Sequence, residues 1–140
     1  MIRLAVVLLA AASPAATQVA PLSFEPGKAL PLAPGQWSYI PTAGGSLASF
    51  GSAVTLRCDR TTRTVTITRP SSGVATGPLT FATSSLIRTL PLGGRLLAND
   101  PLLDAIAFSR GRFLMSDGAG PILAIPAWPE AARSIEDCRN

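Results

Sequence analysis

The sequence predicts an α+β domain, mainly antiparallel β in the form of a small sandwich or barrel, with two short helices and one disulfide. Two stretches on either side of residue 60 alternate apolar and polar residues with the period of a half-buried strand. The helical patterns are short, begin at prolines and lie in the C-terminal part of the chain. The two cysteines, Cys58 and Cys138, are far apart in sequence, which fits one long-range structural bridge.

The N-terminus has the layout of a secretory signal peptide over residues 1–15. A short positive end precedes an apolar run, and small residues precede the expected cleavage after Ala15. The apolar run is about half the ~20 residues that a membrane-spanning helix needs, so an uncleaved anchor is the weaker alternative. We therefore expect a periplasmic or secreted protein with no transmembrane segment in the mature chain.

A proline-rich segment follows over residues 16–35. Its proline density predicts an extended arm that contains no helix. Residues 36–140 are then expected to form a single β-rich domain. Its first strand is predicted over 36–40, and residues 47–50 are expected to pair only weakly with a neighbour.

The clearest strand signal is a hairpin whose arms are residues 54–58 and 64–68. Apolar residues alternate there with threonine and arginine, and a polar connection of hairpin length joins the two arms. The alternation places Cys58 on the buried face. Two further strands are predicted over 79–83 and 86–90.

The segment from Asn99 to the C-terminus predicts a helix, a hairpin and a second helix. Asp100 and Pro101 are typical of a helix start, and Gly111 is the expected end of that helix. The hairpin is predicted to turn over residues 117–120, and Pro129 opens the last helix.

The expected export of the chain favours a structural role for the two cysteines. In an oxidising compartment, two cysteines of a small domain most simply form one disulfide, here Cys58–Cys138. Closing a loop of about 80 residues stabilises the fold by up to about 4 kcal/mol in the chain-entropy description. A redox pair is usually a close CxxC, and zinc needs four ligands in a chain that has no histidine.

The basic residues are almost all arginine, since Lys28 is the single lysine among 12 basic and 8 acidic residues. Arginine binds carboxylates and phosphates in a bidentate manner. The expected partners of an exported chain are another envelope protein or an anionic envelope component, and no nucleic acid. The arginines proposed to contact an anion or partner are Arg57 and Arg63 of the first hairpin and Arg110 and Arg112 at the expected helix end.

Each pair of arginines also has an ordinary structural explanation. Arginines on a hairpin commonly form a solvated face. Arg110 and Arg112 complement the negative end of the helix dipole without any ligand.

No catalytic arrangement emerges from the sequence. A GxSxG motif is absent, and without histidine a Ser-His-Asp triad has no base. Asp117-Gly118 is better explained as a hairpin turn than as an aspartic protease segment. Gly93-Gly94-Arg95 lacks the lysine of a P-loop. We therefore predict no catalytic, cofactor-binding or metal-binding residues, and no cofactor.

The C-terminal unit of about 40 residues resembles the invasion-associated locus B family of bacterial envelope proteins. The resemblance is carried by the following segments: Asp104-Ala105-Ile106, Arg110-Gly111-Arg112, Asp117-Gly118, Ala124-Ile125-Pro126 and Ala131-Ala132. Trp37 and Cys58 match the early tryptophan and cysteine of that family. The resemblance implies an exported β-rich domain with a non-enzymatic envelope role, and it transfers no catalytic residue.

The leading functional hypothesis is an exported, periplasmic, non-enzymatic binding or interaction protein of the bacterial envelope. Two alternatives remain open at this stage. One is an inhibitor of an exported enzyme or a small hydrolase, based on exposed loops such as residues 70–78. The other is a purely structural envelope protein.

Overall fold

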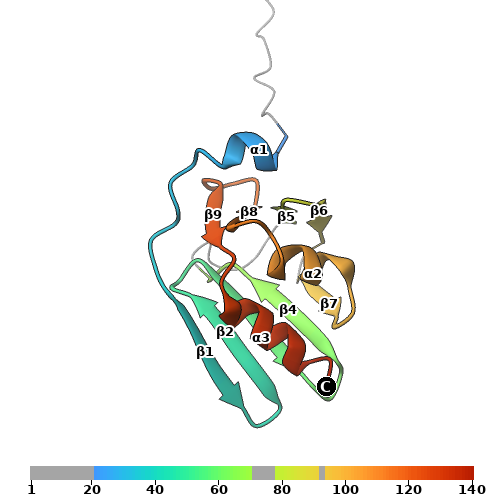
Figure 1. Ribbon diagram of the computed structural model, residues 1–140. Helices are drawn as coiled ribbons and strands as arrows, with labels where there is room; N and C mark the ends of the chain where they lie inside the picture. The colour runs from blue at the N-terminus through green and yellow to red at the C-terminus, as the bar shows by residue number, and fades with distance from the viewer. Residues whose placement is uncertain (1–20, 71–77, 92–93) are drawn as a thin grey trace, which may run out of the picture.

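The computed structural model describes residues 21–70, 78–91 and 94–140, and in these ranges it is mainly antiparallel β with short helices (Figure 1). The predicted α+β class is confirmed, with two sheets that share a core and one disulfide. The expected signal peptide lies outside the described residues, as does most of the 70–78 loop.

The first sheet has five strands in the order β1-β2-β3-β4-β7, and all neighbours are antiparallel. The strands are β1 Trp37–Thr42, β2 Gly45–Phe50, β3 Val54–Asp59, β4 Thr64–Thr68 and β7 Arg95–Leu97. The predicted hairpin is confirmed as β3 and β4. The expectation of weak pairing for 47–50 is wrong, because β2 is an inner strand bonded on both sides.

The second sheet has four strands in the order β6-β5-β8-β9. The strands are β5 Leu79–Ala82, β6 Ile87–Leu90, β8 Arg112–Ser116 and β9 Leu123–Pro126. The two strands predicted over 79–83 and 86–90 are confirmed as β5 and β6, which pair with each other, and the predicted C-terminal hairpin is confirmed as β8 and β9. The pairing of β5 with β8 joins the middle of the chain to its C-terminal part.

Two helices accompany the C-terminal hairpin, α2 Pro101–Ala107 and α3 Pro129–Asp137. Asp100 caps α2 as predicted, since its side chain accepts a hydrogen bond from the Leu102 amide. The predicted helix end at Gly111 is wrong, because α2 stops at Ala107. After the helix ends, the Ser109 hydroxyl accepts a hydrogen bond from the Ser84 amide and donates one to the Arg112 carbonyl. Gly111, with its positive φ, therefore belongs to the turn that leads into β8 and does not cap the helix.

The proline-rich segment contains a short helix, α1 Phe24–Gly27, so the prediction that it has none is wrong. Pro26 lies in the first turn, where a helix has no intrahelical bond for a proline to break. Phe24 is buried in a small cluster with Leu114 and other apolar residues of the second sheet. The segment then continues along β9, where the Ala33 amide donates to the Ala124 carbonyl.

The main core lies between the inner faces of the two sheets and the inner sides of α2 and α3. Phe50, Phe81 and Phe113 are its largest fully buried side chains. Helix α3 packs on β1, β2 and β3, in front of the sheet in Figure 1. Along β3 and β4, inward-facing apolar residues alternate with outward-facing threonine, arginine and aspartate, so this part of the sheet presents a second, largely polar face away from the core.

Candidate binding surface

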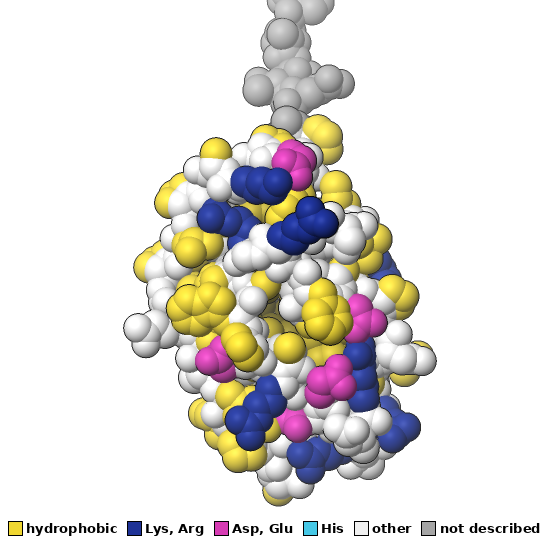
Figure 2. Space-filling view, in the orientation of Figure 1, with side chains coloured by type: hydrophobic (Ala, Val, Ile, Leu, Met, Phe, Trp, Pro, Cys, Tyr) yellow, Lys and Arg dark blue, Asp and Glu magenta, His cyan; other side chains and the backbone are white. Residues whose placement is uncertain are grey.

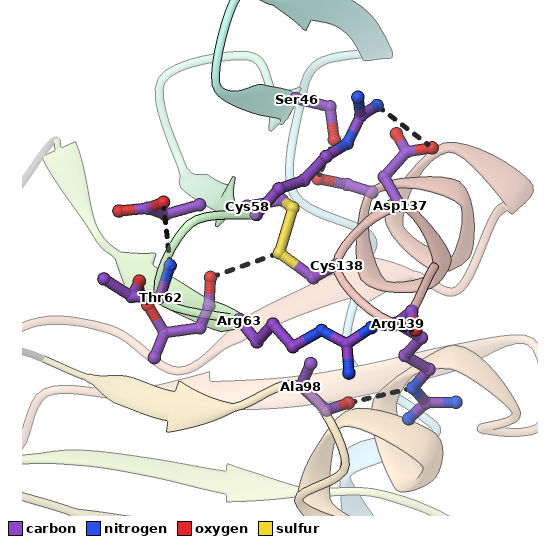
Figure 3. Close-up of a disulfide and its surroundings, with 12 residues drawn as sticks. Ser46, Cys58, Thr62, Arg63, Ala98, Asp137, Cys138 and Arg139 are labelled. Atoms are coloured by element: carbon purple, nitrogen blue, oxygen red, sulfur yellow. Dashed lines mark hydrogen bonds and ion pairs between the residues drawn. A yellow bond between two sulfur atoms is a disulfide. The ribbon is translucent and has the colours of Figure 1, made fainter.

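The predicted disulfide is present and joins β3 to the end of α3. Cys58 and Cys138 form an S–S bond of 2.00 Å, with their Cα atoms 5.6 Å apart, and both residues are buried (Figure 3). Beside the bridge, Ser134 of α3 and Ser46 of β2 share a buried hydrogen bond of 3.0 Å. The last helix is therefore fixed to the inner face of the five-stranded sheet by covalent and polar contacts.

Arg110 and Arg112 have different surroundings. The Arg112 guanidinium donates to the Leu30 carbonyl at 2.7 Å and so holds the segment after α1 against β8. Arg110 is exposed, and within the described ranges its side chain makes no hydrogen bond or ion pair. The contacts of Arg112 therefore serve the packing of the N-terminal segment.

The arginines of the first hairpin diverge. Arg63 donates to the Arg139 carbonyl at 3.2 Å, and Arg60 lies 4.0 Å from Asp137 at the end of α3. Arg69 is buried and pairs with Asp117. Arg57 alone points from the middle of β3 to the outer face of the sheet.

A second arginine joins Arg57 on this outer face. In the strand register, Arg57 lies opposite Thr66, and Thr66 lies opposite Arg95 of β7. Strands are about 4.8 Å apart, so the Cα atoms of the two arginines are about 10 Å apart across β4. Both arginines are exposed. Arg95 is a functional candidate that sequence reasoning missed, because β7 itself was not predicted.

The row of Arg57, Thr66 and Arg95 borders a hollow of about 620 Å³ on the sheet. The lining is mostly small or hydroxyl-bearing: Thr42, Ala43, Gly44, Arg57, Cys58, Asp59, Thr64, Thr66 and Arg95. Two arginines and one aspartate give this lining a formal charge of one positive unit. Such a surface offers hydrogen-bond donors to a negatively charged group.

Asp59 is the negative charge within the hollow, and the hairpin turn fixes its position. Its carboxylate accepts hydrogen bonds from the amides of Thr62 at 3.3 Å and Thr61 at 2.9 Å. The bond from the Thr62 amide is the main reason that the pKa of Asp59 lies below its usual value, and Arg95 lowers it further. Asp59 is therefore ionised at neutral pH and acts as a turn cap.

The two arginines keep most of their donors for a ligand. Arg95 uses its Nε atom to donate to the Thr64 hydroxyl at 3.3 Å, and this bond orients the side chain along β4. For Arg57, the described residues provide no hydrogen bond and no ion pair. An oxyanion in the hollow can therefore contact the terminal nitrogens of Arg95 and all the donors of Arg57.

A second hollow of about 500 Å³ is also bordered by two arginines, Arg63 and Arg139, but both donate to neighbouring groups of the protein. Figure 2 shows acidic side chains among the basic ones on the face that carries α2 and α3. Arg139 is one example, since it donates to Asp104 at 2.8 Å and to Glu136 at 2.9 Å. It also donates to the Ala98 carbonyl beside the disulfide, as Figure 3 shows. These charges are used to hold α3 in place.

Two further features are absent from the described residues. No cluster of three or more histidine, cysteine, aspartate or glutamate residues in the described ranges is able to hold a metal ion. No helix in those ranges is long and apolar enough to cross a membrane.

Comparison with known proteins gives no match: no family model, no curated protein and no solved structure is significantly similar to this chain.

Proposed function

We propose that the protein is an exported, non-enzymatic binding protein of the bacterial envelope, and that the outer face of the five-stranded sheet is its contact surface. The observation that carries this proposal is the row of Arg57, Thr66 and Arg95, which places two exposed arginines beside one hollow. Two neighbouring arginines whose N–H donors are mostly unused within the protein are a feature of a recognition surface.

Two features of the chain support an extracytoplasmic location. The first fifteen residues have the composition of a secretory signal peptide. The Cys58–Cys138 bridge is of a kind that persists in oxidising compartments. Export also determines which anions the arginines meet, namely those of cell-wall polymers, lipids and envelope proteins. The family resemblance of the C-terminal unit agrees with such a role.

Co-sedimentation with isolated envelope fractions tests the proposal. The mature, disulfide-bonded chain is mixed with cell-wall sacculi or with membrane vesicles, and the bound fraction is measured at moderate salt. The double variant Arg57→Ala and Arg95→Ala is compared with Arg110→Ala, which removes an exposed arginine whose side chain makes no hydrogen bond or ion pair in the described ranges.

We expect the wild type and Arg110→Ala to sediment with an envelope fraction, and the double variant to lose most of this binding. Equal sedimentation of all three proteins, or no sedimentation of any of them, would overturn the proposal. Release of folded protein by osmotic shock tests the location independently. The alternative of an inhibitor or small hydrolase relied on the 70–78 loop, most of which lies outside the described residues.

A further inference from the structure

We infer that the hollow on the outer sheet face binds one singly charged oxyanion, a carboxylate or a phosphodiester, between Arg57 and Arg95. The inference deepens the proposed function, because it names the chemical class of ligand for the same surface.

The register brings three donors into one row. Arg57 and Arg95 point to the same face from β3 and β7, and the Thr66 hydroxyl lies between them on β4. A guanidinium group is planar and contacts two oxygens of a carboxylate or phosphate at once. Two such groups separated by one strand can approach a single oxyanion from opposite sides, with the threonine beneath it.

The surrounding backbone keeps the row open. The β1-β2 turn borders the hollow with Ala43 and Gly44, which have little or no side chain. Gly45 begins β2 opposite Asp59, and a Cβ atom there would collide with the Cys58 carbonyl. The turn therefore passes close to β3 without a side chain that would cover the hollow.

Asp59 limits the charge that the hollow accepts. It lies two residues from Arg57 on the same face of β3, and the turn amides hold its carboxylate in place. A ligand with one negative charge is attracted by the net positive lining. The attraction of a ligand to this weakly positive lining rises in proportion to the ligand's charge, whereas the cost of removing the ligand from water rises with the square of that charge. The hollow should therefore prefer a monoanion to a dianion of similar shape.

A nuclear magnetic resonance titration of the full, disulfide-bonded, ¹⁵N-labelled chain tests the inference. The probes are acetate, dimethyl phosphate and, at pH 8, hydrogen phosphate, each added at constant ionic strength. The signals to follow are the side-chain Nε–H groups of Arg57 and Arg95 and the amide of Thr66. Arg110 is the internal control for general screening of charge.

Acetate and dimethyl phosphate should shift the signals of Arg57 and Arg95 to saturation and leave Arg110 unchanged. The two monoanions should bind at least about threefold more tightly than hydrogen phosphate, in line with the charge argument. Asp59→Asn keeps an acceptor oxygen for the turn amides, so the hairpin should remain. This variant should lose most of the preference for the two monoanions over hydrogen phosphate.

Equal shifts at all three arginines, an absence of saturation, or tighter binding of hydrogen phosphate to the wild type would overturn the inference. The two monoanions also distinguish the sources, because acetate represents cell-wall or protein carboxylates and dimethyl phosphate represents lipid phosphodiesters. Binding of small monoanions without envelope binding would contradict the envelope role alone. Envelope binding that depends on both arginines, without monoanion binding, would contradict the ligand class alone.

Discussion

Arg69 and Asp117 form an ion pair of 3.0 Å that joins the end of β4 to the β8-β9 turn, with 5 % and 11 % of the two side chains exposed. Arg69 also donates to the Pro121 carbonyl in the same turn. The pair therefore connects the five-stranded sheet to the four-stranded sheet, and the described residues contain no strand pairing between these two sheets.

Asp117→Asn should destabilise the fold. Asparagine keeps an acceptor for the amides of Ala119 and Gly120, so the turn is retained, but it removes the charge that faces a buried guanidinium. Removing one partner of a buried pair leaves the other charge poorly compensated, and we expect a loss of about 3 kcal/mol in the free energy of unfolding. Urea unfolding measures this loss. A change below about 0.5 kcal/mol would contradict the assigned role of the pair.

The same aspartate predicts an acid-dependent loss of stability. The bond from the Gly120 amide is the main cause that holds the pKa of Asp117 below its usual value, and Arg69 contributes as well. A lowered pKa in the folded state means that the stabilisation is complete above about pH 5, and that it is lost as the pH falls below the unfolded value of about 3.9. The stability difference between the wild type and Asp117→Asn should therefore shrink on acidification. A difference that stays constant down to about pH 2 would argue against this linkage.

Removal of the disulfide should weaken the attachment of α3. The double variant Cys58→Ala and Cys138→Ala removes a covalent link between two positions that are 80 residues apart in the sequence. We expect a loss of about 3 kcal/mol in the free energy of unfolding. Mass analysis of exported protein before and after reduction should differ by two hydrogens. Two free thiols in the exported protein would contradict the bridge.

Gly45 and Gly44 provide a matched pair of substitutions at the β1-β2 turn. Gly45→Ala should destabilise the fold by about 2 kcal/mol, because its Cβ atom meets the Cys58 carbonyl, which is backbone and cannot move aside cheaply. Gly44→Ala should be nearly neutral, since nothing lies within 4 Å of its added Cβ. Thermal unfolding of both variants measures the difference in stability. Equal melting temperatures would contradict the close approach of Gly45 to the Cys58 carbonyl.

Loss of Arg112 should loosen the segment that follows α1. The guanidinium bond to the Leu30 carbonyl is one of the contacts that hold this segment on the second sheet. Arg112→Ala should therefore increase cleavage there in limited proteolysis and leave the melting temperature almost unchanged. Arg110→Ala is the control. Equal cleavage of the two variants would contradict the role of Arg112 in holding this segment.

The sequence was sufficient for the elements with strong local signals. Alternation predicted β3 and β4, a capping aspartate followed by proline predicted the start of α2, and the cysteine pair predicted the bridge. Each of these signals lies in neighbouring residues or in an unambiguous chemical partner. That is why they could be interpreted without tertiary information.

Elements whose stability comes from their neighbours were missed or undervalued. β2 begins with glycine and carries alanine and serines, so its inner position depends on pairing with both neighbouring strands. β7 has only three residues and shows no alternation of its own. α1 is held by burial of Phe24 rather than by helix propensity. The missing β7 explains why Arg95 was not connected with Arg57.

Photo-crosslinking in living cells tests the central claim that the outer face of the five-stranded sheet is the contact surface. A photoreactive phenylalanine derivative replaces Ile40, which is 54 % exposed on β1 in the same cross-strand row as Arg57. The control position is Phe108 at the end of α2, which is 75 % exposed. The account predicts an envelope adduct from position 40 that disappears with Arg57→Ala and Arg95→Ala, and none from position 108. An adduct from position 108 alone, or one from position 40 that persists without both arginines, would contradict it.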